Sequence, residues 1–334
     1  MLDELSVFET NRGAPVPRRT ATVLSVATEL PVGRLTTADL AERLGVTEEW
    51  IYSRTGISER PQAADDERLS DLAAQAGRKA LAAAGVDASQ LDLVIVATIT
   101  ADEVTPNTAP LVAHELGAVN AGAFDVGAAC TGFLTGMSLA AAQIETGRAS
   151  HVLLVGADFV TRITDYTDRK TAPLFADGAG AVVIAAARDQ ADGAIGPIVL
   201  GADGAQGETI VAQHSDRLLS MDGPEVFRHA VTRMHEATLA ALQQADVALE
   251  EIDLFVFHQA NARITKALAE RIGADPARVV DCIERLGNSS AATLPLALAA
   301  AQADGRLKPG ATVLIGAFGA GFTFGAGVLT WGGQ

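Results

Sequence analysis

The sequence predicts an α/β protein made of two similar halves. The segments ALAAAGVDASQLDLVIV (80–96) and ALQQADVALEEIDLFVF (241–257) share a pattern of small, apolar and acidic residues at a constant separation of 161 positions. The same separation relates HVLLVGAD, which contains Val152, to TVLIGAFG, which contains Val313. Unbroken apolar runs such as VIVATI and FVF indicate strands buried on both faces, as in a largely parallel sheet covered by helices.

Each half has the same order of elements. An amphipathic helix leads into a buried strand, and a later strand is followed by a glycine-rich turn and a further strand, at 178–187 and 319–330. The repeat unit is half of the protein, whereas solenoid repeats span roughly 20 to 50 residues. We therefore predict an extended arm at residues 1–20, a first half at 21–188 and a second half at 189–334, with the halves packed about a pseudo-twofold axis.

Composition narrows the class of protein. Of the 334 residues, 49% are apolar and 20% are charged, which is ample for a large core. The net charge of −16 argues against binding to nucleic acid or to anionic membranes, because both require an excess of Lys and Arg. The apolar runs are far shorter than a membrane span, and the start MLDELSVFET lacks a signal-peptide pattern. We expect a cytoplasmic protein.

Two cysteines stand alone in the sequence. Neither forms a CxxC pair or has metal-ligand spacing to a histidine, so we expect no disulfide framework and no metal site. Cys130, in AGAFDVGAACTGFLTG, follows a short strand and a turn of small residues and stands at the start of a helix. Free N–H groups there stabilise a thiolate, which favours a nucleophile with a lowered pKa. An inert buried thiol is the alternative for Cys130, and it is the favoured interpretation of Cys282.

Two polar residues of the second half point to the same site. His258 ends the buried strand EIDLFVF, at the edge of the sheet where α/β folds place active sites. Asn288 lies in GNSSAATLP, and 161 positions before it is residue 127, so the duplication puts Asn288 opposite Cys130 across the pseudo-twofold axis. Taken singly, His258 is more often a structural residue and Asn288 a turn or cap residue. Three polar residues that converge on one axis indicate a single site.

These segments resemble the motifs of the ketoacyl-ACP synthase III family, in the thiolase superfamily. DVGAACTGF, HQANARI and GNSSAATLP carry the cysteine, histidine and asparagine, and GAFGAGFTFGAGVLTW carries the glycine loop. EEWIYSRTGISER and FADGAGAVVI extend the resemblance from about residue 21 to the end of the chain. The resemblance implies a five-layered αβαβα thiolase fold built from two duplicated halves, usually as a homodimer.

The resemblance also implies the reaction of a beta-ketoacyl-ACP synthase. An acyl-CoA primer transfers its acyl group to Cys130, malonyl-ACP loses carbon dioxide, and the resulting carbanion attacks the thioester to give 3-oxoacyl-ACP in fatty-acid or polyketide chain initiation. A thiolate suits this chemistry because it is both a good nucleophile and a good leaving group. His258 and Asn288 would stabilise the enolate as paired donors, and the backbone N–H groups of Cys130 and Gly321 would form an oxyanion hole. No cofactor is expected.

Four further residues match positions that bind CoA in the family. Trp50 and Arg54 match the pair that sandwiches the adenine, Arg162 matches another CoA-contacting arginine, and Asn261 matches a residue that lines the CoA tunnel. A purine stacks well on an aromatic ring or a guanidinium plane. Without the resemblance, Trp50 would be taken for a core residue and Arg54 for a solvated charge.

A basic helix face follows His258. Arg263 and Lys266 lie three residues apart on the predicted helix and resemble the family's dock for acyl carrier protein. Carrier proteins are acidic, so a local basic patch on a chain of net charge −16 would steer them to the tunnel mouth. A solvated helix face is the alternative, more serious for Lys266 than for Arg263.

One departure from the family bears on the primer. Thr105, in TITADEVTPNTAP, stands where acetyl-preferring bacterial members commonly have a Phe that reaches across the dimer and closes the acyl pocket. Replacing Phe by Thr removes most of a ring and leaves room for a longer or branched chain. We hypothesise a primer larger than acetyl.

Two alternatives stay open. The chain could be a natural-product acyltransferase or starter-unit synthase of the same fold, although retention of the Cys, His and Asn set favours decarboxylative condensation. It could also be a non-catalytic partner of a condensing enzyme, although such partners generally lack the nucleophilic cysteine. Plant-type chalcone synthases share the three residues but are longer and usually end in a different glycine motif.

Overall fold

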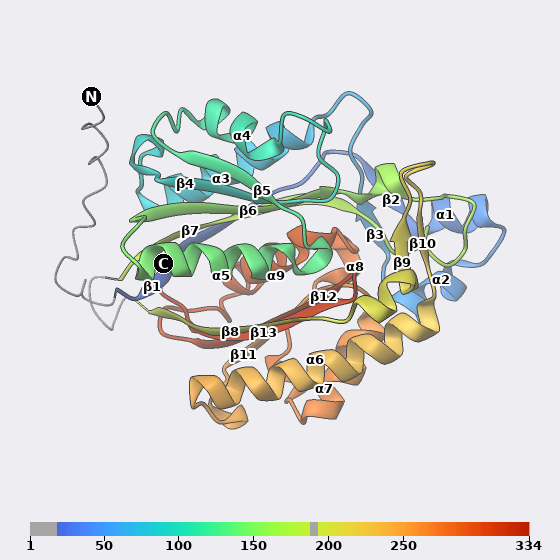
Figure 1. Ribbon diagram of the computed structural model, residues 1–334. Helices are drawn as coiled ribbons and strands as arrows, with labels where there is room; N and C mark the ends of the chain where they lie inside the picture. The colour runs from blue at the N-terminus through green and yellow to red at the C-terminus, as the bar shows by residue number, and fades with distance from the viewer. Residues whose placement is uncertain (1–18, 188–192, 334) are drawn as a thin grey trace, which may run out of the picture.

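Two β-sheets run through the molecule (Figure 1). The computed structural model describes residues 19–187 and 193–333. The first sheet has the strand order β1-β7-β6-β4-β5, formed by Ala21–Glu29, Asp177–Ala186, His151–Phe159, Leu93–Ala97 and Gly122–Val126. Strand β4 pairs in parallel with β5 and β6, and β7 is antiparallel to both β6 and β1. The central strands are buried along nearly their whole length, as their unbroken apolar runs predict.

The second sheet repeats this order without the edge strand β5. Its strands run β11-β12-β13-β8, formed by Leu254–Phe257, Thr312–Gly319, Thr323–Thr330 and Ala194–Ala202. Strand β11 is parallel to β12, and β13 is antiparallel to β12 and β8. Where the first half has β5, the second half keeps only a single parallel bridge between Phe255 and Val279. The duplication is therefore complete in the core and reduced at one edge.

Six helices form three layers around and between the sheets. They are α3 (Leu69–Ala84), α4 (Thr108–Leu116), α5 (Gly132–Glu145), α6 (Gly223–Ala245), α7 (Ala262–Ile272) and α9 (Thr293–Ala303). In Figure 1, α3 and α4 cover the outer face of the first sheet, α5 and α9 lie between the sheets, and α6 and α7 cover the second sheet. Within the described ranges, no helix combines the length and apolar character that a bilayer crossing demands.

Shorter elements gather at one end of the sheets (right in Figure 1). They are α1 (Thr37–Leu44), α2 (Glu48–Thr55), α8 (Ile283–Leu286), the strand pair β2 (Arg34–Thr36) and β3 (Glu59–Pro61), and the strand pair β9 (Ile210–Ala212) and β10 (Leu219–Met221). Residues 1–18 of the predicted arm lie outside the described residues. So does the predicted division at 188 and 189, and these boundaries stay a prediction.

Matching aspartates begin the core strands of the two halves. Asp92 accepts a hydrogen bond from the His151 N–H at 3.1 Å, and Asp253 accepts one from the Thr312 N–H at 2.8 Å. Each bond joins the start of one strand to the start of its parallel neighbour, β6 or β12. The repeated aspartate thus sets the same strand alignment in both halves.

The layers approach each other closely through small residues. A Cβ on Gly180 of β7 would lie 2.7 Å from the Cβ of Pro295 in α9, and one on Gly136 of α5 would lie 2.5 Å from Cδ1 of Leu154 in β6. Neither distance is compatible with a side chain unless the helix moves away from the sheet. The high glycine content therefore serves the contact between the inner helices and the first sheet.

Candidate active site

Two equivalent backbone turns meet at the contact between the halves. The 3₁₀ turns η2 (Ala129–Thr131) and η8 (Ser290–Ala292) lead into α5 and α9. Their first residues, Ala129 with φ 47° and Ser290 with φ 52°, both adopt the left-handed conformation and lie 161 positions apart. Such a conformation costs a non-glycine residue on the order of 1 to 3 kcal/mol and is concentrated at functional sites. We call these turns the first and second elbow; they present Cys130 and Ala291, respectively.

The strand ends facing the two elbows differ in one side chain. Asp158, near the end of β6, accepts a hydrogen bond from the Ala291 N–H at 3.1 Å. Its equivalent in β12 is Gly319, where a Cβ would lie 2.8 Å from the Cys130 nitrogen. A carboxylate therefore occupies the space beside the second elbow, whereas glycine leaves the space beside the Cys130 N–H open to a ligand.

One cavity of about 650 Å³ brings Cys130, His258 and Asn288 together. Its apolar wall comes from both halves and includes Ile99, Val160, Leu174, Phe175, Ile210, Leu219, Met221 and Phe318. The cavity is thus suited to an apolar chain that ends at a small polar cluster. Across residues 19–187 and 193–333, no three His, Cys, Asp or Glu side chains gather in a way that could hold a metal ion.

Burial dominates the electrostatics of Cys130. The residue is partly accessible through the cavity, but desolvation raises the pKa of its thiol to about 12. The hydroxyl of Ser290 acts in the opposite direction, and the charge of Asp158 raises the pKa further. The lowered pKa expected from the position at a helix start is therefore not found in this structure, because burial disfavours the charged thiolate.

His258 is held as a neutral imidazole. Desolvation lowers its pKa to about 3, and its Nδ1 lies 2.6 Å from the Thr293 hydroxyl oxygen at the start of α9. The ring also packs edge-on against Phe318, with centroids 5.3 Å apart. These contacts fix the ring plane and leave Nε2 as the nitrogen without a protein partner among the described residues.

Asn288 is oriented from both its backbone and its side chain. Its N–H donates to the Leu174 carbonyl at 3.0 Å, and its carbonyl accepts from the Ala176 N–H at 2.9 Å. Its Oδ1 accepts from the Ser290 N–H at 3.0 Å. With the oxygen committed to a backbone donor, the Nδ2 end of the amide is the donor end.

The predicted adenine pair lies at the cavity, but its two members stack on each other. Trp50 and Arg54, both in α2, line the cavity, with the guanidinium carbon 4.4 Å from the ring centroid. Asn261 also lines it, and its Nδ2 donates to the Arg54 carbonyl at 3.0 Å, joining α7 to α2. A purine between two planes needs roughly 7 Å, twice a van der Waals contact, so Arg54 must swing away to form a sandwich.

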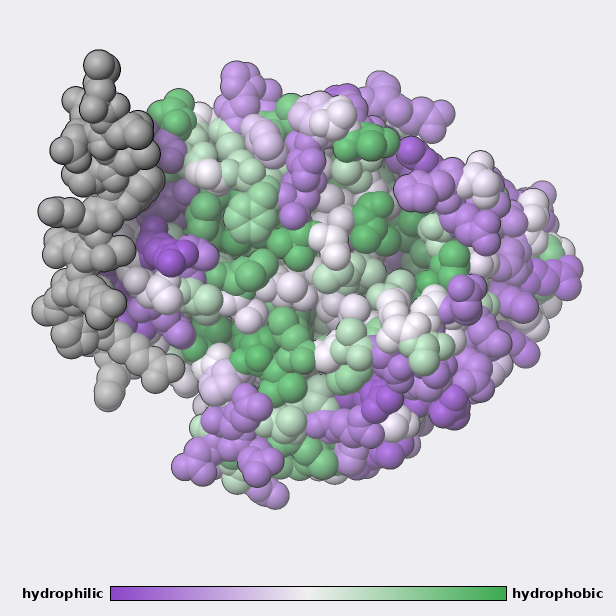
Figure 2. All heavy atoms as spheres, viewed as in Figure 1, coloured by the Kyte–Doolittle hydropathy of each residue, from purple (hydrophilic) through white to green (hydrophobic). Residues whose placement is uncertain are grey.

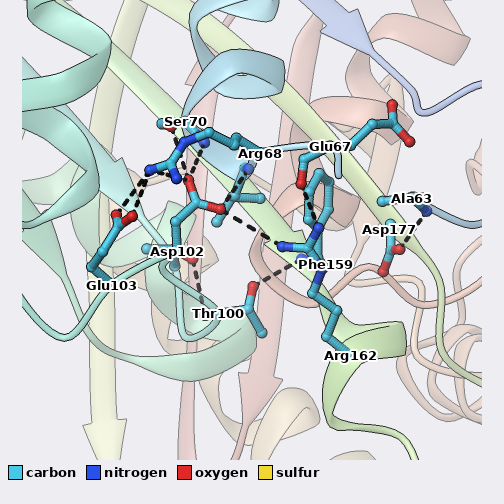
Figure 3. Close-up of polar contacts among 12 residues, drawn as sticks. Ala63, Glu67, Arg68, Ser70, Thr100, Asp102, Glu103, Phe159, Arg162 and Asp177 are labelled. Atoms are coloured by element: carbon cyan, nitrogen blue, oxygen red, sulfur yellow. Dashed lines mark hydrogen bonds and ion pairs between the residues drawn. The ribbon is translucent and has the colours of Figure 1, made fainter. Parts of the chain in front are cut away.

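Arg162 is not among the cavity-lining residues. Figure 3 shows its guanidinium beside Asp102, Phe159 and Glu67. Its guanidinium lies over the Phe159 ring at 4.6 Å, forms an ion pair with Asp102 at 3.7 Å, and donates to the carbonyls of Ala64 and Glu67. Through these contacts, the Arg162 side chain joins the segment before α3 to the turn after β4. The structure therefore does not bring Arg162 to the other residues predicted to bind CoA.

Two basic residues that the sequence analysis missed line the cavity instead. Arg169 and Lys170 follow Arg162 by seven and eight residues, and both are exposed at the cavity wall. Arg169 is fixed by a hydrogen bond from its Nε to the Leu44 carbonyl at 3.0 Å. Their adjacency in TDRKTAP is the only sequence signal, and it does not distinguish them from a solvated charge pair.

The glycine turn between β12 and β13 contributes neighbouring residues to those predicted. Gly319 and Ala320 line the cavity, whereas Gly321, the predicted oxyanion-hole residue, does not. The Ala320 carbonyl accepts a hydrogen bond from the Thr323 hydroxyl at 3.1 Å, which fixes this turn. The structure therefore brings Gly319 and Ala320, rather than Gly321, to the wall of the cavity that contains Cys130.

The remaining predicted residues lie at or beyond the cavity mouth. Arg263 lines the cavity and is exposed, while Lys266 is 79% exposed at its side chain and lies 4.0 Å from Glu270. Thr105 is exposed and is not part of the cavity wall of its own chain.

Comparisons with known proteins agree with this arrangement. The family models for 3-oxoacyl-[acyl-carrier-protein (ACP)] synthase III and for its C-terminal part match residues 124–204 and 242–331. The beta-ketoacyl-[acyl-carrier-protein] synthase III of Rhodospirillum rubrum is 45% identical over 314 residues, covering 90% of this chain and 96% of that protein. Synthase III 3 of Streptomyces coelicolor is 41% identical over 327 residues, covering 94% and 98%.

Solved structures are similar over the same length. The synthase III of Thermus thermophilus has a TM-score of 0.90 at 41% identity, covering 94% of this chain and 100% of that one. The priming beta-ketosynthase of the R1128 polyketide biosynthetic pathway has a TM-score of 0.91 at 38% identity, covering 96% and 98%.

The predicted fold class is confirmed by these likenesses, and together with the cysteine at the first elbow it defines a condensing acyltransferase of the thiolase fold. The likeness in sequence is more specific than the likeness in fold. The chain belongs to the 3-oxoacyl-ACP synthase III family, as its motifs predict.

Folding stability at low pH tests the neutral state of His258. Its pKa is about 3 in the folded chain and near 6.5 when unfolded, so between these values the unfolded state binds the extra proton. This residue therefore makes stability fall by about 1.4 kcal/mol per pH unit as the pH drops from about 6.5 to 3. We expect urea unfolding between pH 4 and 7 to show a shallower loss for His258→Gln than for the wild-type chain.

The difference in pH dependence between the wild-type protein and the His258→Gln variant isolates the contribution of His258 to stability. Asp177, whose pKa burial raises to about 6, makes the opposite contribution, but it is present in both chains and cancels. His114→Gln, which changes an exposed histidine, is the matched control. Equal slopes for the wild type and His258→Gln would show that His258 does not have this depressed pKa.

Proposed function

We propose that this chain condenses an acyl-CoA primer with malonyl-ACP, releasing carbon dioxide and forming 3-oxoacyl-ACP. The observation that carries the proposal is the single cavity that joins an elbow cysteine to a neutral histidine and an oriented asparagine. An apolar wall beside these groups suits an acyl chain.

In the first half-reaction, Cys130 accepts the primer. The sulfur attacks the thioester carbonyl of acyl-CoA, the carbonyl oxygen becomes an oxyanion, and CoA leaves as the thiolate. The Cys130 N–H is one proposed donor to this oxyanion, because Gly319 leaves the space beside it open. The N–H of Ala320 replaces that of Gly321 as the second proposed donor, because Ala320 lines the cavity and Gly321 does not.

In the second half-reaction, His258 and Asn288 hold the malonyl thioester oxygen. Decarboxylation places negative charge on that oxygen as the enolate forms, and two neutral donors in a water-poor site stabilise it without a change of protonation. Asn288 supplies Nδ2–H. His258 supplies Nε2–H in the tautomer in which the Thr293 hydroxyl donates its proton to Nδ1, across the 2.6 Å contact between them. In that state the hydroxyl gives up its hydrogen bond to the Ser290 carbonyl at 3.0 Å.

The mouth of the cavity is proposed to bind the remainder of CoA. Trp50 offers a ring face for the adenine once Arg54 moves aside, and Arg54, Arg169 and Lys170 offer charges for phosphates. Asn261 holds the backbone of α2 against α7 and so supports the shape of this mouth. Arg162 has no place in this proposal, since its guanidinium is engaged elsewhere.

Arg263 is proposed as the main contact for the acidic carrier protein. It is exposed at the cavity mouth at the start of α7. Because the chain as a whole is acidic, a local positive charge there directs an acidic carrier protein to this part of the surface. Lys266 contributes less, because Glu270 lies within 4.0 Å of its ammonium group. A cytoplasmic location is part of this proposal, because acyl-CoA and acyl carrier protein would both be met there.

The active molecule is proposed to be a homodimer joined at β5. This strand is the edge of the first sheet, and an unpaired edge offers backbone groups to a second strand. Apolar side chains are exposed there, with Phe124 of β5 38% and Val119 83% exposed, and Figure 2 shows hydrophobic residues gathered over the middle of this face. Thr105, next to Val104 at 85% exposure, lies on a loop that can reach a second copy.

A larger primer than acetyl follows from Thr105 if that residue closes the partner's cavity. A threonine fills less of the pocket than the phenylalanine of acetyl-preferring members. The likeness to a priming ketosynthase of a polyketide pathway keeps a starter-unit role as the alternative function for this chain. A non-catalytic role is disfavoured by the presence of Cys130 at the elbow.

Intact-mass measurement after incubation with an acyl-CoA panel tests the first half-reaction. We expect one acyl adduct per chain, with isobutyryl and hexanoyl groups loaded at least severalfold faster than acetyl, because the pocket lacks the phenylalanine. Cys130→Ala should show no adduct, and Cys282→Ala should behave as the wild type. A clear preference for acetyl-CoA would refute the primer size, and absence of any adduct would refute the acyl-enzyme itself.

Decarboxylation of malonyl-ACP separates the catalytic and docking roles. We expect Asn288→Ala to lower kcat about 10²- to 10³-fold, since it removes one donor to the enolate oxygen. Arg263→Glu should raise KM for malonyl-ACP with little effect on kcat, and Lys266→Glu should have a smaller effect on KM. Acyl loading without carbon dioxide release in the wild type would instead support an acyltransferase.

Light scattering tests the dimer. We expect twice the chain mass of 34.4 kDa, and a monomer for Phe124→Glu, because a carboxylate at the edge strand opposes its pairing. Leu239→Glu, at a 50% exposed position on α6, is the matched control and should remain dimeric. A wild-type chain that is monomeric at micromolar concentration contradicts the proposal.

A further inference from the structure

The cavity wall contains one buried hydroxyl beside the second elbow, that of Ser290. Ser290 is only 2% exposed, yet its Oγ makes no hydrogen bond of normal geometry with any described residue. An unpaired buried hydroxyl costs free energy, so its presence calls for an explanation. Because Ser290 lines the same cavity as Cys130, the hydroxyl is available to a reacting group there.

The backbone of Ser290 adds a second sign of function. It adopts φ 52°, the left-handed conformation of its equivalent Ala129. Alanine at the first elbow shows that the conformation does not depend on a side-chain hydroxyl. The serine at the second elbow is therefore not needed to form the turn, and its hydroxyl is free for another role.

The hydroxyl is near both the sulfur and a buried carboxylate. Ser290 lines the same cavity as Cys130, and the next residue, Ala291, donates its N–H to Asp158 at 3.1 Å. Ser290 lowers the pKa of the Cys130 thiol and also that of the Asp158 carboxyl, so it is close enough to stabilise negative charge on either. Burial is the largest effect on both groups and raises both pKa values. A donor shared between two desolvated anionic positions is worth more than the same donor in water.

Asp158 does not depend on this donor. Its Oδ1 accepts from the Thr98 hydroxyl at 3.0 Å, the Ile99 N–H at 2.8 Å and the Thr100 hydroxyl at 2.9 Å. Its Oδ2 accepts from the Ala291 N–H at 3.1 Å. With four donors in place, the carboxylate is satisfied, and the Ser290 proton can turn to the sulfur.

We propose that Ser290 is a further catalytic residue of this site, whose Oγ–H donates a hydrogen bond to the Cys130 sulfur whenever that sulfur carries negative charge. The proposal rests on the role of Cys130 proposed above. In the condensation step, the carbanion forms a C–C bond to the acyl carbon, the C–Sγ bond breaks, and its electron pair returns to Sγ. Ser290 keeps its proton throughout and stabilises the departing thiolate.

The chemistry explains why the donor is required. The enzyme must form a thiolate before loading and release one after condensation, in a place where desolvation opposes the charge. The negative charge of Asp158 opposes it further. The Ser290 hydroxyl acts against both effects at the sulfur.

Alkylation of Cys130 by iodoacetamide tests the proposal without any substrate. We expect Ser290→Ala to slow alkylation about tenfold at each pH from 7 to 10, equivalent to raising the thiol pKa by one unit. Ser289→Ala is the matched control, since Ser289 is fully buried, has an unpaired Oγ among the described residues, and does not line the cavity. It should react at the wild-type rate.

A second measurement follows C–S cleavage directly. Pre-acylated Ser290→Ala mixed with malonyl-ACP should form product about tenfold more slowly in a single turnover, with an unchanged KM. Ser290→Gly, which removes the hydroxyl and relieves the left-handed strain, should show the same loss, so a folding defect is separable from the chemical one.

The outcomes distinguish this proposal from the proposed function. Equal rates for Ser290→Ala and Ser289→Ala, or equal losses in both, would overturn the role of Ser290, as would a wild-type Cys130 that resists alkylation at every pH. Failure of the wild type to accept an acyl group from CoA would overturn the proposed function, while the alkylation rates would still report on Ser290.

Discussion

A buried carboxylate links the two halves of this protein beside the active site. Asp158, at the end of β6, accepts three hydrogen bonds from the turn after β4 and one from the Ala291 N–H of the second elbow. A buried charge is tolerated only when donors surround it, so its position and that of its donors are mutually fixed. This contact acts together with the backbone bonds of Asn288 to Leu174 and Ala176 to hold the second elbow against the first half.

The residues of the active site lie where the two halves differ from each other. The two elbows share backbone conformation, but one presents a cysteine and the other an alanine, and Asp158 faces one while Gly319 faces the other. The elbow that faces Asp158 is closed by that side chain, whereas the elbow that faces Gly319 keeps the space beside the Cys130 N–H open to a ligand. Burial then keeps the groups of the open site neutral, with the thiol pKa raised and the His258 pKa lowered.

Much of this was determined by the sequence alone. Apolar strand runs and a constant offset of 161 positions predict the duplicated α/β fold, because periodicity along the chain is a direct consequence of regular secondary structure. The same offset predicts that Cys130, His258 and Asn288 lie near one axis, because residues one repeat length apart occupy equivalent positions in the two halves. Contiguous motifs around these residues identify the family.

Only the tertiary structure decided which neighbours face the cavity and in what electrostatic state. Arg169 lines it rather than Arg162, and Ala320 rather than Gly321, because side-chain and peptide directions within a turn depend on what the turn packs against. The thiol pKa likewise depends on the depth of Cys130 between the packed layers, a quantity that no local pattern contains. Sequence thus determined the residue types and the family, while packing determined their surroundings.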